Sequence, residues 1–263
     1  MAPLLTLAPH RSTTAGLLAG AARDRGLEVV ILSRAGIPDR LRGSGGAHYY
    51  GGPHFASDVA GPLGVALLEP AEGWLDALPY ACTGREIKRV RLSEARREKG
   101  PVFVKPPTDK SFPAAVYEDG SALLVPSLQK DPLVQVSDVV TWATEFRLFL
   151  LDGEVRTGSQ YATFGRLDAA PLEGHQDEAG VRDFARRLTE ACGATLPSGV
   201  VVDVGRMWGP GGRDTERWAV VEANMAWFSN VYAADPVGAL DVVLRAAGPR
   251  GQVRAQDARF CRP

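Results

Sequence analysis

The chain has 263 residues, of which 45% are hydrophobic and 23% charged, as in an ordinary globular protein. Its formal net charge of −1 excludes an overall positive field for nucleic acid or an anionic membrane. No apolar stretch reaches the roughly twenty residues of a membrane span, and the first residues do not resemble a signal peptide. The three cysteines and four histidines have no spacing typical of a disulfide framework or a histidine-based metal site, so we expect a cytoplasmic protein.

The first residues predict a β–α–β unit. Residues 3–9 are a short apolar run, residues 13–26 have the composition and end signals of a helix, and residues 27–33 form a second buried strand. This order indicates a parallel sheet. The turn after the first strand has no GxGxxG pattern, so we exclude a Rossmann dinucleotide site.

The next segments predict a loop and then a connector. Residues 43–54 are rich in glycine and aromatic residues and predict a loop, which continues through residues 57–64. Residues 65–70 predict a third short strand. The charged residues 74–99 predict packed helix and a short strand that connect the N-terminal unit to the second part of the chain.

From residue 100 onward the pattern is that of short strands punctuated by turns. The strands are expected in residues 101–107, 114–119, 122–127, 133–140, 145–162, 198–207 and 217–225, with a hairpin turn inside 151–155 and a hairpin loop at 208–216. An amphipathic helix is expected at residues 177–193, and a short helix at 235–248.

Polar side chains interrupt the last two apolar strands. Glu222 and Asn224 lie two residues apart and therefore on one face of a strand, and Asp203 approaches Glu222 if the two strands pair. Two such carboxylates repel unless a proton or a cation lies between them. Oxygen ligands select Mg²⁺ or Mn²⁺, which usually bridges to substrate phosphates, and Lys105 and Lys110 then serve as phosphate counter-charges.

This order of residues resembles the ATP-grasp family, which holds ATP between two α+β lobes. The resemblance implies that Lys105 contacts the phosphate and adenine, that the hinge meets the adenine edge, and that Glu145 binds the ribose. The implied hinge residues are Asp138, Val139, Val140 and Thr141, and the implied magnesium ligands are Asp203, Glu222 and Asn224.

The sequence is more closely similar to a small branch of this family that is marked by one arginine and two lysines, the arginine–two-lysine clade. Arg85, Lys105 and Lys110 supply these residues. The resemblance implies a mixed α/β and α+β fold, an ATP-grasp fold with an N-terminal β–α–β pre-ATP-grasp lobe. The expected boundaries are residues 1–73 for that lobe, 74–99 for the connector and 100–263 for the ATP-grasp domain.

The sequence departs from the family at two positions. The loop after Lys105 has no glycine, where many relatives have a Gly-rich flap over the phosphates. Many ligases of the family also carry an arginine two residues before the magnesium aspartate, where this chain has Val201. Arg147 or Arg206 could stabilise a developing oxyanion instead.

Each residue also has a purely structural interpretation. Lys105 could extend its ammonium group to solvent, Glu145 and Arg147 could form an ion pair on one strand face, and Arg85 could belong to a solvated face. Three residues are balanced between a functional and a surface role: Lys110, Ser159 and Tyr161. The aromatic residues that follow the metal strand could pack in the core or line an acceptor pocket with Ser229 and Asn230; they are Trp227, Phe228 and Tyr232.

The leading functional hypothesis is an ATP-dependent carboxylate–amine ligase that acts through an acyl phosphate. Its substrates are ATP, a small-molecule or peptide carboxylate and an amine, with Arg85 or Arg147 orienting the carboxylate and Lys110 helping to hold the phosphates. A small-molecule kinase on the same fold is the alternative. A non-catalytic nucleotide-binding module is the third hypothesis, and it predicts ATP binding without hydrolysis.

Overall fold

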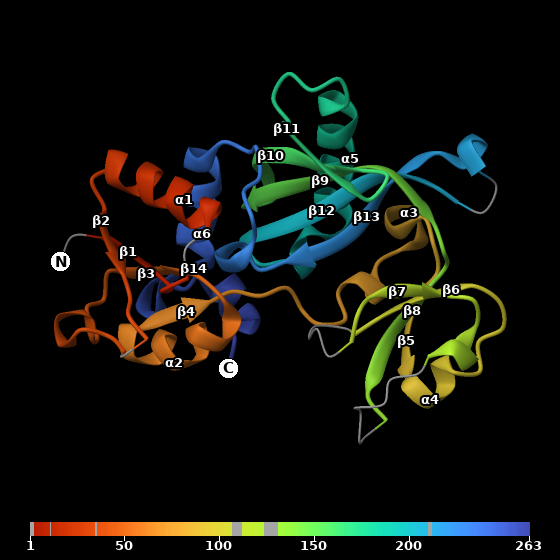
Figure 1. Cartoon of the computed structure of the whole chain (residues 1–263). Helices are drawn as coiled ribbons and strands as arrows, with labels where there is room; N and C mark the ends of the chain where they lie inside the picture. Colours follow the sequence, from red (N-terminus) through yellow and green to blue (C-terminus); the bar gives the residue numbers. More distant parts are fainter. Residues whose placement is uncertain (1–2, 11, 35, 107–111, 124–130, 210–211) are drawn as a thin grey trace.

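The structure is a computed structural model that describes residues 3–10, 12–34, 36–106, 112–123, 131–209 and 212–263. Figure 1 shows three bodies: an N-terminal α/β unit, a large antiparallel sheet flanked by a helix, and a small lobe built around a second antiparallel sheet. The mixed α/β and α+β class expected from the sequence is confirmed. In the described residues, no helix combines the length and the apolar character needed to cross a membrane.

The N-terminal unit is a parallel sheet with the strand order β2-β1-β3. Its elements are β1 (Leu4–Leu7), α1 (Thr13–Asp24), β2 (Glu28–Ile31), β3 (Ala47–Tyr50) and α2 (Pro53–Leu63). The helix α1 begins after Ser12, whose hydroxyl accepts a hydrogen bond from the backbone N–H of Ala15. The predicted β–α–β opening and its parallel pairing are confirmed.

Some predictions for this unit are wrong. The loop predicted over residues 43–64 contains β3 and α2. Tyr49 and Tyr50 are buried where β3 pairs with β1, and this burial stabilises the four-residue strand. The neighbouring glycines had indicated a loop instead. β2 lies at the sheet edge and is only partly buried. The third strand, β4 (Val65–Leu67), pairs with β14 (Ala247–Pro249) at the other end of the chain.

The small lobe is an antiparallel sheet with the order β5-β8-β6-β7. Its elements are β5 (Ile87–Arg91), α4 (Leu92–Ala95), β6 (Val102–Lys105), β7 (Ala115–Tyr117) and β8 (Leu133–Ser137), and α3 (Tyr80–Thr83) precedes them. β5 comes from the segment predicted as a connector, and it pairs along its whole length with β8. Lys110 lies outside the described residues. So do residues 124–127 of the strand predicted at residues 122–127.

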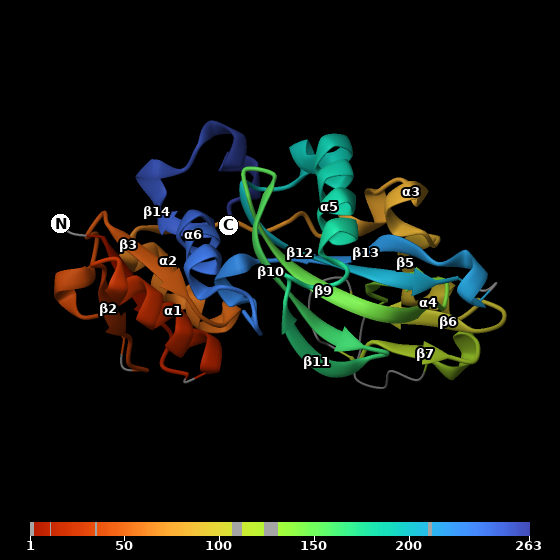
Figure 2. The same ribbon diagram turned by 90° about the horizontal axis from the view of Figure 1, so that it is seen from above.

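The large sheet is antiparallel with the order β11-β10-β9-β12-β13. Its strands are β9 (Thr141–Leu151), β10 (Glu154–Thr163), β11 (Arg166–Pro171), β12 (Gly199–Trp208) and β13 (Arg217–Asn224). Asp152 and Gly153 have φ angles of 53° and 84°, which form the predicted two-residue hairpin turn between β9 and β10. The helix α5 (Glu178–Cys192) packs along one face of the sheet, as Figure 2 shows.

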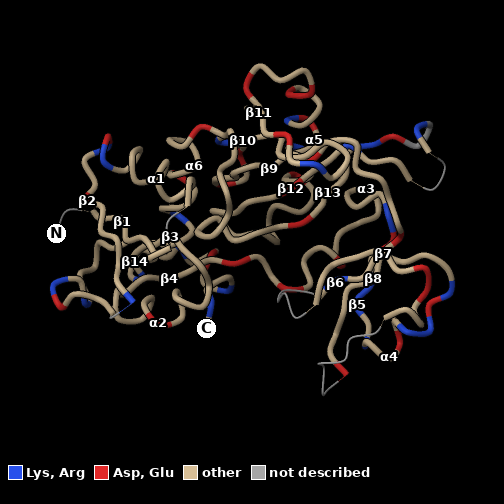
Figure 3. Tube along the Cα trace, in the orientation of Figure 1, with Lys and Arg blue, Asp and Glu red and all other residues tan. Residues whose placement is uncertain are grey.

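Short 3₁₀ helices complete the connections. They are Asp39–Leu41, Leu75–Ala77, Gly120–Ala122, Gly193–Thr195, Gly212–Thr215, Ala226–Phe228, Arg250–Gln252 and Ala255–Phe260. Basic and acidic residues are interspersed along the described chain (Figure 3).

One face of the large sheet shares an apolar core with the N-terminal unit, its other face packs with α5 in a second core, and the small lobe has a third. The helix α6 (Pro236–Ala246) lies in the shared core together with Trp227, whose indole N–H donates to the carbonyl of Leu68 at 3.0 Å. The small lobe is packed around Val104 and Val134. Because bodies with separate cores move at the segments that join them, we expect the small lobe to move as a unit.

His48 gives this shared core a pH-dependent stability. Its Nδ1–H donates to the carbonyl of Leu244 at 2.8 Å, and burial lowers the pKa of the imidazole below 6.5. The folded protein therefore binds this proton more weakly than the unfolded chain, so the stabilisation is complete above pH 6.5 and is lost as the pH falls below it. Urea unfolding at about pH 7.5 and about pH 5.5 should show a larger loss of stability for wild type than for His48→Gln. Equal losses in both proteins would contradict this assignment.

Candidate active site

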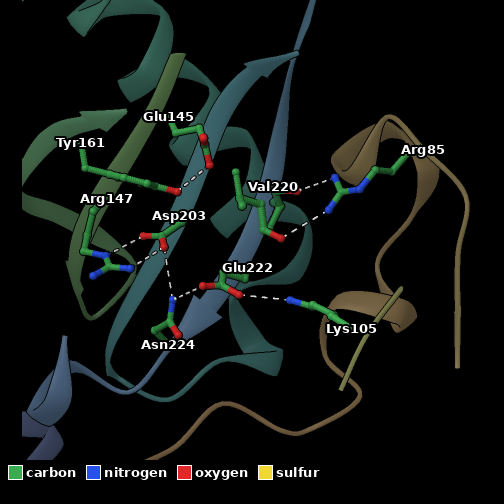
Figure 4. A network of polar contacts seen from close by, with 10 residues as sticks. Arg85, Lys105, Glu145, Arg147, Tyr161, Asp203, Val220, Glu222 and Asn224 are labelled. Atoms are coloured by element: carbon green, nitrogen blue, oxygen red, sulfur yellow. Dashed lines mark hydrogen bonds and ion pairs between the residues drawn. The ribbon is translucent and has the colours of Figure 1, made fainter. Parts of the chain in front are cut away.

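Asp203 and Glu222 lie directly opposite each other on β12 and β13, as the sequence pattern predicts. Asn224 lies on the same face as Glu222 and connects the two acids (Figure 4). Its Nδ2 donates to Asp203 Oδ2 at 3.2 Å and to Glu222 Oε1 at 3.0 Å. The two carboxylates thus converge on a single donor atom, which means that they are close enough to share one cation.

Arg147 neutralises Asp203 from the other side. It lies on β9 in register with Asp203, and its Nε and Nη2 donate to the two carboxylate oxygens at 2.9 and 2.7 Å. The Asp203 side chain is only 1% exposed. Burial raises the pKa of Asp203, and the guanidinium opposes this shift. The ion pair of Arg147 is therefore with Asp203 on the neighbouring strand and not with Glu145 on its own strand.

Lys105 joins the small lobe to the large sheet. It ends β6, and its Nζ lies 3.0 Å from Oε2 of Glu222. Burial raises the pKa of Glu222, but Lys105 and Asn224 outweigh this effect and hold the pKa below its ordinary value. Lys105 thus contacts a half-buried carboxylate and is not a solvent-directed lysine. Each of the two opposed acids therefore has its own protein cation.

Glu145 receives a hydrogen bond from a residue that the sequence left undecided. The hydroxyl of Tyr161 donates to Glu145 Oε2 at 2.7 Å. Burial raises the pKa of Glu145, and the nearby acids Asp203 and Glu222 add to the rise. The Tyr161 ring stacks on Tyr232 with centroids 5.4 Å apart. Strand alternation was the only sequence feature that bears on the direction of the Tyr161 side chain, and it does not predict this contact.

Arg85 is buried and holds the backbone of the strand that carries Glu222. Its Nη1 donates to the carbonyl of Val220 at 2.8 Å, and its Nη2 donates to that of Val221 at 3.3 Å. The guanidinium also lies over the ring of Trp142, 5.1 Å from the centroid. Burial lowers the pKa of Arg85 to about 10. The interpretation of Arg85 as a charge on a solvated face is wrong, since it is 8% exposed.

The predicted hinge is the segment that leads from the small lobe to the large sheet. Asp138, Val139 and Val140 connect the end of β8 to Thr141, the first residue of β9. The Asp138 side chain accepts a hydrogen bond from the backbone N–H of Glu86 at 3.0 Å. A cavity of about 420 Å³ is lined by Ser137 and Asp138, at the start of this segment. Arg85 and Asp138 both line it, so the two predicted residues share one hollow at the hinge.

Val201 and Arg206 both have contacts other than Asp203. Val201 is fully buried in the apolar core that contains α6, where a guanidinium would be unpaired. Arg206 Nη1 lies 3.5 Å from Oδ1 of Asp177, just before the start of α5.

The aromatic residues after β13 have different surroundings. Trp227 is in the core, Phe228 is exposed and Tyr232 stacks on Tyr161 in the site.

The donor set fits a magnesium ion. Two carboxylates and one carboxamide provide the hard oxygen ligands that Mg²⁺ prefers, and an Asn amide can present either its oxygen or its nitrogen to the shared point. Within the described part of the chain, no group of three or more His, Cys, Asp or Glu side chains could hold a metal ion. The fit therefore depends on Asn224 as well as on the two acids.

Three solved structures illustrate the similarity of the fold. The RimK domain protein ATP-grasp from Sphaerobacter thermophilus DSM 20745 has a TM-score of 0.58 and 20% identity over 92% of this chain and 100% of that chain. The D-alanine–D-alanine ligase from Bacillus anthracis complexed with ATP has a TM-score of 0.52 and 12% identity, over 93% and 97%. The ATP-grasp ligase PsnB complexed with minimal precursor, Mg and ADP has a TM-score of 0.51 and 12% identity, over 92% and 97%.

These identities establish the fold alone. No curated protein matches the chain. The model of an ATP-grasp domain family, family 2 of the arginine–two-lysine clade, matches residues 82–242, which include Arg85, Lys105 and the three predicted metal ligands. The chain therefore belongs to the arginine–two-lysine clade of the ATP-grasp family, in agreement with the resemblance noted in its sequence.

Proposed function

We propose that the protein is an ATP-dependent carboxylate–amine ligase that acts through an acyl phosphate. The observation that carries the proposal is the row of contacts from Lys105 through Glu222, Asn224 and Asp203 to Arg147, which crosses from the small lobe to the large sheet. Such an arrangement suits a triphosphate held by a cation on one side and an ammonium group on the other. The relatives that are ligases support the reaction class.

The nucleotide is assigned to the residues that the family pattern implies. Asp203, Glu222 and Asn224 would hold Mg²⁺, which would supply neutralisation of the negative charge of the triphosphate. Lys105 exchanges its contact with Glu222 for a phosphate, and Glu145 binds the ribose. The hinge residues from Asp138 to Thr141 meet the adenine. Lys110, assigned to the phosphates, lies outside the described residues.

The reaction has two displacements. A substrate carboxylate oxygen attacks the γ-phosphorus, the bond to ADP breaks, and an acyl phosphate forms. The amine then attacks the acyl carbon, phosphate leaves and the amine loses a proton. Arg147 is paired with Asp203, one of the acids assigned to the metal, and can stabilise the oxyanion of the second step. We assign Arg85 to holding β13 in place, because its guanidinium donates to the carbonyls of Val220 and Val221.

Replacing Glu222 tests the function directly. The wild-type protein with ATP, Mg²⁺ and a pool of amino acids and peptides should yield ADP, phosphate and an amide, detected by mass spectrometry. Glu222→Gln should lower the turnover on the order of 10²- to 10³-fold, because a charged ligand of the metal is lost. The exposed acid Glu190 on α5 provides a matched control, and Glu190→Gln should retain the wild-type rate.

Three results would each reject part of this proposal. A phosphorylated product without free phosphate would identify the protein as a small-molecule kinase. ATP binding without turnover under any acceptor would identify a nucleotide-binding module. Undiminished turnover by Glu222→Gln would remove the metal assignment while leaving the family membership intact.

Removing Arg147 should lower the stability of the fold, because a buried acid is left unpaired. Arg147→Met leaves Asp203 without its bidentate partner, so we expect a loss of about 3–5 kcal/mol in the free energy of unfolding. The double variant Arg147→Met with Asp203→Asn should recover part of that loss, because the buried charge is gone. Urea unfolding measures both, and Arg186→Met, an exposed arginine on α5, is the control. An additive double variant would contradict the pairing.

A further inference from the structure

Tyr161 occupies an irregular position near the end of β10, which lies between β9 and β11 in the large sheet. On one side the register of β10 shifts between Gln160 and Ala162, which lie opposite Phe146 and Glu145 of β9. The pairing with β11 also shifts between Gln160 and Ala162. Tyr161 is therefore the extra residue of a β-bulge in the pairing with β9, whereas in the pairing with β11 the extra residue lies on β11. Bulges beside functional sites redirect a side chain.

The bulge places the Tyr161 hydroxyl on Glu145, as Figure 4 shows. Burial and the neighbouring acids Asp203 and Glu145 raise the pKa of Tyr161, so the phenol remains protonated and donates. The donor–acceptor distance of 2.7 Å is that of a good hydrogen bond to a carboxylate. A Glu side chain has several rotatable bonds, and a fixed donor restricts the carboxylate to one orientation.

Tyr161 is itself held in place by two further contacts. Its ring is stacked on that of Tyr232, with an interplanar angle of 15°. The guanidinium of Arg147 lies 5.5 Å from the Tyr161 centroid and 5.3 Å from the Tyr232 centroid. Tyr232 has a φ angle of 53°, which is uncommon for a bulky residue and is maintained only where the surroundings fix it.

The segment that carries Tyr232 is anchored to both neighbouring bodies. The backbone N–H of Ala233 donates to Ser159 Oγ at 3.2 Å on β10, and that of Val231 donates to Thr14 Oγ1 at 3.1 Å on α1. The same segment follows β13, which carries Glu222. The Tyr232 ring thus has a fixed backbone, from which it supports Tyr161.

We propose that Tyr161 is a positioning residue that orients Glu145 toward the ribose hydroxyls of ATP, and that Tyr232 supports it by stacking. The inference rests on the proposed function, because it takes Glu145 as the ribose acid. It extends that function by naming the groups that set the preference for a ribonucleotide. Neither tyrosine touches the reacting atoms in this proposal.

The test is equilibrium binding of ATP, 2′-deoxyATP and 3′-deoxyATP in the presence of Mg²⁺, measured by calorimetry. Wild type should prefer ATP over at least one deoxynucleotide. Tyr161→Phe keeps the ring but removes the donor, so this preference should fall about tenfold while affinity for that deoxynucleotide stays unchanged. If Tyr161 had only a structural role, Tyr161→Phe would weaken the binding of all three nucleotides equally.

Three further variants keep the test independent of the folding of one protein. Tyr232→Ala should reduce the preference in the same direction as Tyr161→Phe, whereas Tyr232→Phe, which retains the stacking ring, should keep it. Tyr49→Phe is the matched control, because its hydroxyl donates to the carbonyl of Gly52 in the N-terminal unit. It should also show the wild-type preference.

The possible failures are distinguishable. Wild type that does not bind ATP would overturn the proposed function together with this inference. Wild type that binds ATP and both deoxynucleotides equally would remove the ribose role of Glu145 and the inference with it. Wild type that prefers ATP, with the same preference in Tyr161→Phe and Tyr232→Ala, would overturn the positioning role alone.

Discussion

The structure of the site depends on the need to neutralise a carboxylate inside an apolar strand. Asp203 lies between valines on β12 and is almost completely buried, where an unpaired charge is very costly. Arg147 meets this need through two parallel hydrogen bonds from the neighbouring strand. The alignment of β9 with β12 and β13 is therefore constrained by charge as well as by apolar packing, and the other site residues are arranged around this fixed pair.

The same arrangement divides the molecule into a rigid part and a part that can move. The large sheet packs with the N-terminal unit and α6 on one face and with α5 on the other, whereas the small lobe has a core of its own. The ion pair between Lys105 and Glu222 crosses that division. In the proposed function, a nucleotide that binds between the two replaces this pair with contacts to its phosphates. Lys105 would then neutralise Glu222 in the nucleotide-free state and become a phosphate ligand afterwards.

The sequence predicted the parts of the site that follow from alternation and hairpin pairing. Glu222 and Asn224 share a face, and Asp203 lies opposite Glu222, because both facts require only the period of two and the loop that joins the strands. The partner of Arg147 could not be predicted, since it depends on the register between β9 and β12, which are distant in sequence. Tyr161 was undecided for a related reason: a bulge shifts the alternation that sequence arguments assume. In the N-terminal unit, tertiary burial of Tyr49 overrode the local signal of the glycines.

A crystal structure with a non-hydrolysable ATP analogue and Mn²⁺, recorded at a wavelength where manganese scatters anomalously, tests the proposed site most directly. We expect an anomalous peak bound by Asp203, Glu222 and Asn224, with Lys105 moved from Glu222 to a phosphate. A manganese ion held elsewhere, with Lys105 still on Glu222 and the triphosphate outside this group, would contradict the proposed site.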